Sequence, residues 1–299
     1  MGRKQKSINE QVVVITGASS GIGRATVEAF AQKGAKLVIA ARSIDVLETD
    51  AQALQEQGVE AVAVEADVSN REDVAKIADA AIERFGRIDT WVNNAGVSIY
   101  GRLDEVSDED NRRLFDVNFW GVVNGSLTAL PHLLKTGGAL INVGSEVSDA
   151  VVPLQGMYSA SKHAVKGFTD ALRVEIEDVD KAMMSITLIQ PTAVNTPYPQ
   201  HAKNYMNREP ALPTPQIDPT QVAQAIVSAA ESPTRDVTVG AMSKMNTMMF
   251  KLLPSLGDKM SAKQVNRQQY DEAPRDPEGS LYRPSGGGSM HGEHGPWPH

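Results

Sequence analysis

Short apolar runs alternate with longer segments of helical spacing through the first 240 residues. The runs are Val12–Thr16, Leu37–Ala41, Ala61–Val64, Ile88–Val92, Ala139–Val143, Ser185–Ile189 and Val237–Val239. Between them, segments such as Ile22–Lys33 and Val74–Phe85 repeat their apolar residues with the period of an amphipathic helix. Apolar strands that alternate with helices predict an α/β fold, a doubly wound (Rossmann-like) parallel sheet with helices on both faces.

The alternation ends near residue 240, which divides the chain into one domain, residues 8–240, and a C-terminal extension, residues 241–299. The segment Met245–Met260 is rich in methionine and leucine, and Pro254 interrupts its helical pattern. We expect the segment Met245–Met260 to pack on its own domain, for example as a lid helix, or on a partner subunit. The alternative is a helix that lies on a membrane surface. The tail from Pro284 is polar and rich in glycine, so we expect it to be flexible. Its histidines, His291, His294 and His299, do not have the spacing of a metal site.

Charge and composition narrow the class of protein. The chain has 29 basic and 37 acidic residues, a net charge of −8, which argues against a nucleic-acid partner. It contains no cysteine, so disulfides and thiolate chemistry are excluded. We find no signal peptide and no apolar run long enough to span a membrane, and we therefore expect a cytoplasmic protein.

A glycine-rich turn follows the first predicted strand. Thr16-Gly17-Ala18-Ser19-Ser20-Gly21-Ile22-Gly23 leads directly into a predicted helix. Glycines let the backbone turn tightly, and the free N–H groups at a helix N-terminus attract phosphate. The turn could be a plain strand–helix connection, but its position after the first strand of a parallel sheet favours nucleotide binding.

Three more motifs stand at strand ends. Asn93-Asn94-Ala95-Gly96 follows the fourth run, Ser145 closely follows the fifth, and Pro191–Thr196 follows the sixth. Ligands of an open parallel sheet bind beyond the carboxyl ends of its strands. We therefore expect these motifs and Gly17 to meet at one edge of the sheet and to form a site.

Tyr158 and Lys162 are four residues apart, so on a helix they share one face. A nearby ammonium is expected to lower the pKa of the phenol from its usual value of about 10. Such a phenol can give or take a proton in a reaction between a carbonyl and an alcohol. A tyrosine and a lysine on one helix face are more often an ordinary surface pair, so the motif depends on its context.

Together, TGASSGIG, NNAG, DVNFWG, NVGS and YSASK, in this order over residues 11 to 240, resemble the short-chain dehydrogenase/reductase family. The resemblance implies a nicotinamide-dependent oxidoreductase in which Tyr158 is the general acid/base and Ser145 binds the substrate oxygen. It implies that Lys162 tunes Tyr158 and holds the cofactor ribose, and that Asn118 holds a water in a proton relay. An amide such as that of Asn118 could equally bond a nearby backbone carbonyl. Residues 8–240 then form a dinucleotide-binding catalytic domain.

The cofactor-binding residues implied by this resemblance are Gly17, Ser19, Ser20, Gly21, Ile22, Gly23, Arg42, Asp67, Val68, Asn94, Ala95, Gly96, Tyr158, Lys162, Pro191, Thr192, Val194 and Thr196. Arg42 follows the second strand, where an acidic residue would select NAD, so we predict NADP(H), with Arg42 on the 2′-phosphate. Arg42 could instead begin a solvated helix, and Asp67 could cap one. Thr192 departs from the family's usual glycine, which puts the details of nicotinamide placement in question.

The substrate is expected to be an apolar small molecule with a carbonyl or secondary alcohol. Apolar residues flank Ser145 and Tyr158, and a proline-rich lid follows Thr196, with prolines at 197, 199, 210, 213, 215 and 219. The resemblance further implies a homodimer or homotetramer. The alternative functions are a non-catalytic nucleotide-binding sensor or scaffold, and a lyase or epimerase on the same fold.

Overall fold

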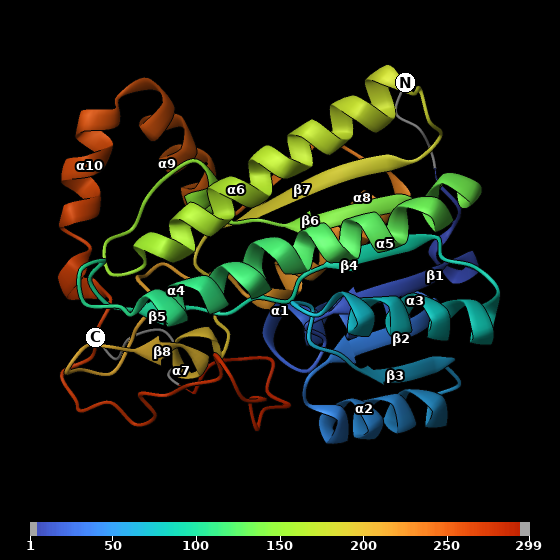
Figure 1. The fold of residues 1–299 in the computed structure, drawn as a ribbon, viewed down its shortest axis with the longest axis horizontal. Helices are drawn as coiled ribbons and strands as arrows, with labels where there is room; N and C mark the ends of the chain where they lie inside the picture. Colours follow the sequence, from blue (N-terminus) through green and yellow to red (C-terminus); the bar gives the residue numbers. More distant parts are fainter. Residues whose placement is uncertain (1–4, 294–299) are drawn as a thin grey trace.

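A seven-stranded parallel sheet forms the centre of the protein (Figure 1). The structure is a computed structural model that describes residues 5–293, except for the side chains of residues 242–246 and 251. The strand order is β3-β2-β1-β4-β6-β7-β9. The strands are β1 Val12–Thr16, β2 Lys36–Ala41, β3 Ala61–Glu65, β4 Thr90–Asn93, β6 Ala139–Val143, β7 Ser185–Pro191 and β9 Asp236–Val239. The predicted doubly wound fold is therefore confirmed.

Helices cover both faces of the sheet (Figure 1). One face is covered by α1 Gly21–Gln32, α2 Ile44–Glu56 and α8 Pro219–Glu231, and the other by α3 Arg71–Phe85, α4 Asp108–Phe115, α5 Gly121–Thr136 and α6 Gly156–Arg173. Side chains alternate between these faces along β1, where Val13 and Ile15 join one apolar cluster and Val12 and Val14 the other. All four are buried, which is why the strand is apolar throughout.

Irregular segments and short elements lie beyond the carboxyl ends of the strands. They include a two-stranded sheet of β5 Ile99–Tyr100 and β8 Lys203–Asn204, and the short helix α7 Tyr198–His201. A π-helical stretch, Asp116–Trp120, joins α4 to α5; a second one, Val174–Val179, follows α6 at the opposite edge of the sheet, near the start of β7. Such irregular helical turns often occur at functional sites. The carboxyl edge of the sheet therefore carries the segments that can form a binding site.

The C-terminal extension begins with α9 Ala241–Leu252 and α10 Pro254–Ala262, which pack on each other beside the end of the sheet (Figure 1). The side chain of Met245 is outside the described residues, as are His294 and His299. The described part of the tail, to Glu293, runs back along the carboxyl edge of the sheet and makes hydrogen bonds there, and its expected flexibility stays a prediction. In the described chain, no helix is long and apolar enough to cross a membrane.

Candidate active site

The glycine-rich turn after β1 is braced by the loop after β4. Asn94 Nδ2 donates to the carbonyls of Thr16 (3.0 Å) and Gly17 (3.2 Å), and Thr16 Oγ1 accepts from the amides of Asn94 and Ala95. Gly17 has φ of +65°, and a Cβ on it would be 2.7 Å from Ala95 Cα. Only glycine fits both that conformation and that approach. The glycine-rich turn after β1 and the Asn93–Gly96 motif after β4, far apart in sequence, thus lie side by side and form one wall of a cleft.

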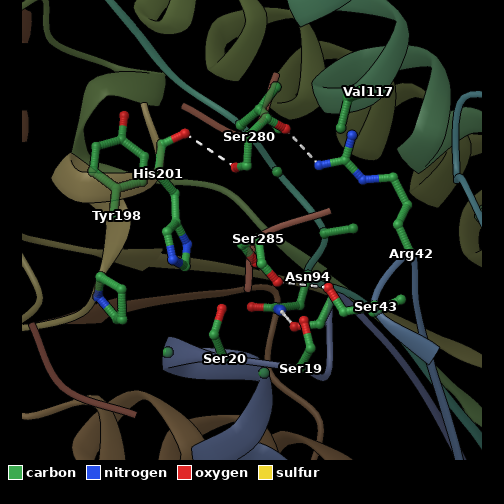
Figure 2. A pocket seen from close by; sticks show the side chains of 18 of the residues that line it. Ser19, Ser20, Arg42, Ser43, Asn94, Val117, Tyr198, His201, Ser280 and Ser285 are labelled. Atoms are coloured by element: carbon green, nitrogen blue, oxygen red, sulfur yellow. Dashed lines mark hydrogen bonds between the residues drawn. The ribbon is translucent and has the colours of Figure 1, made fainter. Parts of the chain in front are cut away.

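A cleft of about 980 Å³, including its open part, lies along this wall (Figure 2). Its lining contains many of the predicted cofactor-binding residues, namely Gly17, Ser19, Ser20, Gly21, Ile22, Gly23, Arg42, Asp67, Val68, Asn94, Ala95, Gly96 and Thr196. Among the predicted residues, the donors include the amides at the start of α1, the hydroxyls of Ser19 and Ser20 and the guanidinium of Arg42. This donor set suits the phosphates and sugars of a dinucleotide.

Two charged residues at the cleft, Arg42 and Asp67, are held by neighbours. Arg42 Nη2 and Nη1 donate to the carbonyls of Ser280 (2.6 Å) and Leu281 (3.2 Å). Burial raises the pKa of Asp67, but hydrogen bonds from Ser69 and Arg113 outweigh it and bring that pKa below its usual value. Asp67 does not cap α3, because the capping side chain is Asn70. Its Oδ1 instead accepts from the Ser69 amide and hydroxyl.

The predicted catalytic side chains meet at the start of α6. Tyr158 is in its first turn, and its hydroxyl is hydrogen-bonded to that of Ser145, which follows β6. Lys162 Nζ lies 5.6 Å from the centre of the Tyr158 ring and donates to the Val143 carbonyl at 2.9 Å. The helical spacing and the strand end thus bring three residues of different type to one point.

The expected direction of the Tyr158 pKa shift is not what the structure shows. Burial raises the pKa of Tyr158 to about 12, although its hydrogen bonds with Tyr198 and Ser145 act in the opposite direction. Burial also lowers the pKa of Lys162 to about 8. The lysine points at a backbone carbonyl rather than at the phenol oxygen, and the cost of burying an ion dominates both groups. At neutral pH Tyr158 is therefore a neutral proton donor.

Asn118 lies in the π-helical stretch and is fully buried. Its Oδ1 accepts from the Val97 amide at 2.8 Å, and its Nδ2 donates to the Val97 carbonyl (3.0 Å) and to Ser161 Oγ (3.2 Å). It does not line the cleft. Among the described residues, its contacts join the loop after β4 to α6, so its part in a proton relay stays a prediction.

A second cavity, of about 900 Å³ with its open part, adjoins the first and holds Ser145, Tyr158 and Lys162. The remaining predicted cofactor residues, Pro191, Thr192 and Val194, also line it. Its other walls are mainly apolar and include Val147, Val152, Leu212 and Pro213. The arrangement places a proton donor at the wall of an apolar space.

Sequence reasoning missed Tyr198, which lines both cavities. Its ring meets that of Tyr158 edge to face, and the two hydroxyls are hydrogen-bonded. The Tyr198 hydroxyl also lies 2.7 Å from Ser98 Oγ and 2.8 Å from Gln155 Oε1. Gln155 is in turn bonded to Gln268 of the C-terminal extension. The only sequence signal for Tyr198 was its place in the proline-rich lid, two residues after Thr196.

Thr192, the departure from the family pattern, fits the turn without strain. It is not among the residues with positive φ in the described chain. Its amide donates to the Val239 carbonyl at 3.0 Å and its Oγ1 to Glu146 Oε2 at 3.1 Å. The threonine therefore links the end of β7 to Glu146, a cavity-lining carboxylate that sequence analysis also missed.

This fold and site define a nicotinamide-dependent oxidoreductase. Residues 11–206 match the short chain dehydrogenase family, and the chain belongs to it. It is 45% identical over 284 residues to the uncharacterized oxidoreductase YxnA of Bacillus subtilis, covering 93% of this chain and 80% of that protein. It is 37% identical over 235 residues to 11-beta-hydroxysteroid dehydrogenase A of Sesamum indicum, covering 78% of this chain and 66% of that protein.

Two solved structures show the same fold. An alcohol dehydrogenase from the archaeon Thermococcus sibiricus, complexed with 5-hydroxy-NADP, is 31% identical with a TM-score of 0.68; the match covers 77% of this chain and 95% of that one. A short chain dehydrogenase/reductase from Burkholderia phymatum, in complex with NAD, is 28% identical with a TM-score of 0.71. The match covers 91% of this chain and 100% of that one. Both coenzymes thus occur among the neighbours, which supports NAD(P)-dependent oxidoreduction.

Proposed function

We propose that the protein interconverts an apolar ketone or aldehyde and the corresponding alcohol with NADP(H). The observation that carries this proposal is the pair of hydrogen-bonded hydroxyls, Ser145 and Tyr158, at the wall of a mainly apolar cavity that adjoins the dinucleotide cleft. A carbonyl oxygen needs such donors when it becomes an alcohol, and an apolar cavity favours a substrate without charge.

When bound, the nicotinamide supplies or accepts the hydride. Tyr158 holds the proton for the substrate oxygen, and its pKa of about 12 keeps it protonated at neutral pH. Ser145 orients the same oxygen with a second hydrogen bond. Lys162 is the cation nearest to these groups among the described cavity-lining residues and is suited to a ribose hydroxyl. Of the other predicted residues, the amides of Ile22 and Gly23 and the hydroxyls of Ser19 and Ser20 would hold phosphate and sugar.

A preference for NADP(H) is supported by Arg42. It follows β2 and lines the cleft, and its guanidinium retains N–H donors beyond the two that bind Ser280 and Leu281. We expect kcat/KM to be higher with NADPH than with NADH. Arg42→Ala should lower the ratio of these two kcat/KM values by a factor of about 10 to 100. No NADPH preference, or one that the substitution leaves intact, contradicts this proposal.

The test of the reaction is a panel of apolar ketones, aldehydes and secondary alcohols, followed by NADPH absorbance and by product analysis. Tyr158→Phe should reduce turnover by a factor of about 10² to 10⁴ yet retain NADPH binding. Turnover of charged keto acids alone would overturn the substrate class. A product formed without net change in NADPH would indicate a lyase or epimerase, and cofactor binding without any turnover would indicate a sensor or scaffold.

We also propose a homodimer or homotetramer built on the long helices α5 and α6. Exposed apolar side chains support it. Trp120, Leu127 and Leu134 stand seven residues apart along α5 and the turn before it, and 51%, 41% and 41% of their areas are exposed. That spacing puts them on one face of the helix.

A further inference from the structure

Residues 279–291, here called the strap, cross the open side of the dinucleotide cleft. The strap begins where the Ser280 amide and hydroxyl donate to the His201 carbonyl, at 2.8 and 3.0 Å. It ends where His291 Nε2 lies 3.0 Å from Asp218 Oδ2, at the start of α8. Figure 2 shows Ser280 and Ser285 facing Arg42 and Ser43 at the cleft. Both serines are part of its lining.

The strap is fastened to residues that form the cleft. Arg42 donates to the carbonyls of Ser280 and Leu281, as described above. Ser43 Oγ donates to the Ser285 carbonyl at 2.8 Å, and the Gly21 amide, at the start of α1, donates to the Ser289 carbonyl at 3.0 Å. These contacts fall at both ends of the cleft wall formed by β1, α1 and β2.

Leu281 anchors the strap through apolar burial. It is fully buried and belongs to the apolar cluster that includes Val68 and Val117, which both line the cleft. The chain enters the strap at Gly279, where φ is +54° and a Cβ would be 2.4 Å from the Ala202 carbonyl oxygen. A glycine at this point lets the chain turn tightly against α7. The strap therefore has one buried apolar side chain, the buried Ser280 beside it, and several hydrogen bonds along an otherwise polar path, including one from the Tyr282 hydroxyl to Asp110 Oδ1 at 2.8 Å.

We propose that the strap is part of the cofactor site and opens to admit and release the dinucleotide. The proposal rests on the proposed function, because it takes the cleft to be the cofactor site. The strap adds Ser280 and Ser285 to the groups around the cofactor and keeps the cleft covered while its contacts hold. A segment held by one apolar anchor and by hydrogen bonds, none of them to a strand of the central sheet, can open without unfolding that sheet.

The first experiment weakens the anchor in the full chain. NADPH association and dissociation are measured by stopped-flow fluorescence, which needs no substrate. Leu281→Ala should raise both rate constants by about tenfold or more. Loss of the apolar anchor increases the fraction of molecules in which the strap is open. Leu256→Ala is the matched control, since Leu256 is an exposed leucine of the same extension, and it should leave both rates within about twofold of the parent.

The second experiment locks the strap closed. The chain has no cysteine, so Ser43→Cys with Ser285→Cys introduces a single pair of thiols where the Ser43 hydroxyl contacts the Ser285 backbone, and loss of free thiols on oxidation verifies the disulfide before rates are compared. Oxidised protein should bind NADPH at least about tenfold more slowly than the same protein after reduction. Each single cysteine variant is the control for the substitution itself.

The outcomes separate the two proposals. Faster exchange in Leu281→Ala and slower exchange in the oxidised pair support the strap. Parent-like rates in Leu281→Ala, or equal rates in the oxidised and reduced pair, overturn it while the proposed function stands. If the parent protein binds neither NADPH nor NADH, the proposed function fails, and the role of the strap with it.

Discussion

The ring of Tyr198 meets the ring of Tyr158 edge to face, with centroids 5.4 Å apart. Their hydroxyls are hydrogen-bonded, and this bond lowers the pKa of Tyr158 while burial, the larger effect, raises it. Tyr198 thus connects the Tyr158 phenol to the buried polar groups Ser98 and Gln155. Under the proposed function, the segment after Thr196 would act on the proton donor as well as enclose the cavity.

Tyr198→Phe should move the pH dependence of alcohol oxidation to higher pH. Removal of the hydroxyl takes away a bond that stabilises the phenolate, so the pKa of Tyr158 rises further. At pH 8 we expect oxidation to slow by about three- to thirtyfold, the effect of one such hydrogen bond. The measurement is kcat against pH. Tyr205→Phe is the control, because Tyr205 bonds Asp110 at 2.6 Å and lines neither cavity. An unchanged pH profile in Tyr198→Phe contradicts the assigned role.

Lys162 should make the folded protein less stable at neutral pH than at high pH. Burial lowers its pKa from 10.5 to about 8, so between these values the unfolded chain retains a proton that the folded chain has lost. The loss of folding free energy caused by burying the charged lysine is present below about pH 8 and disappears as the pH rises toward 10.5.

Lys162→Met removes that loss of folding free energy. At pH 7 we expect the free energy of unfolding to increase by about 1–3 kcal/mol, with the gain shrinking toward pH 10, while turnover is lost. Urea unfolding over this pH range is the measurement. Lys166→Met is the control, since Lys166 pairs with Asp170 at 3.2 Å near the surface, and its replacement should not stabilise the protein. A loss of stability at pH 7 would refute this prediction.

Asn118→Ala should destabilise the fold as well as reduce activity. It removes the partner of both the N–H and the carbonyl of Val97 in a fully buried place, which costs about 2–4 kcal/mol. Urea unfolding measures this loss. Asn124→Ala, which removes a half-buried bond to the Val68 carbonyl, should cost about 1 kcal/mol. If Asn118→Ala leaves stability unchanged and only slows turnover, its main role is in the proton relay.

Leu127→Glu should shift the protein toward the monomer. A charge in the middle of the exposed apolar face of α5 would be buried without a partner in the proposed subunit contact. Light scattering measures the mass of the parent and of the variant. Leu252→Glu is the control, because Leu252 is an exposed leucine of α9, outside the proposed face on α5. The same mass in parent and Leu127→Glu argues against this contact.

The fold and the centre of the site could be predicted because they follow from periodic patterns. The apolar strand runs identified the sheet, and the rule for parallel strand ends brought Gly17, Asn94 and Ser145 to one edge. Tyr198 could not be predicted, since its segment has no regular period. The direction of the Tyr158 pKa shift could not be predicted either, because it depends on how deeply the phenol is buried.

The contacts of the strap gave no sequence signal for a different reason. Arg42, Ser43 and Gly21 all donate to backbone carbonyls, which every residue has. Leu281 is the buried apolar residue of the segment, and a single leucine in a polar stretch is not a pattern. Composition alone therefore favoured a flexible tail.

The hydrogen bond between the Gly21 amide and the Ser289 carbonyl joins the first turn of the sheet to a residue near the other end of the chain. Under the proposed function, a dinucleotide in the cleft would therefore be enclosed between two segments that the chain builds far apart in its sequence. Loss of this single backbone contact would separate them without altering any strand of the sheet.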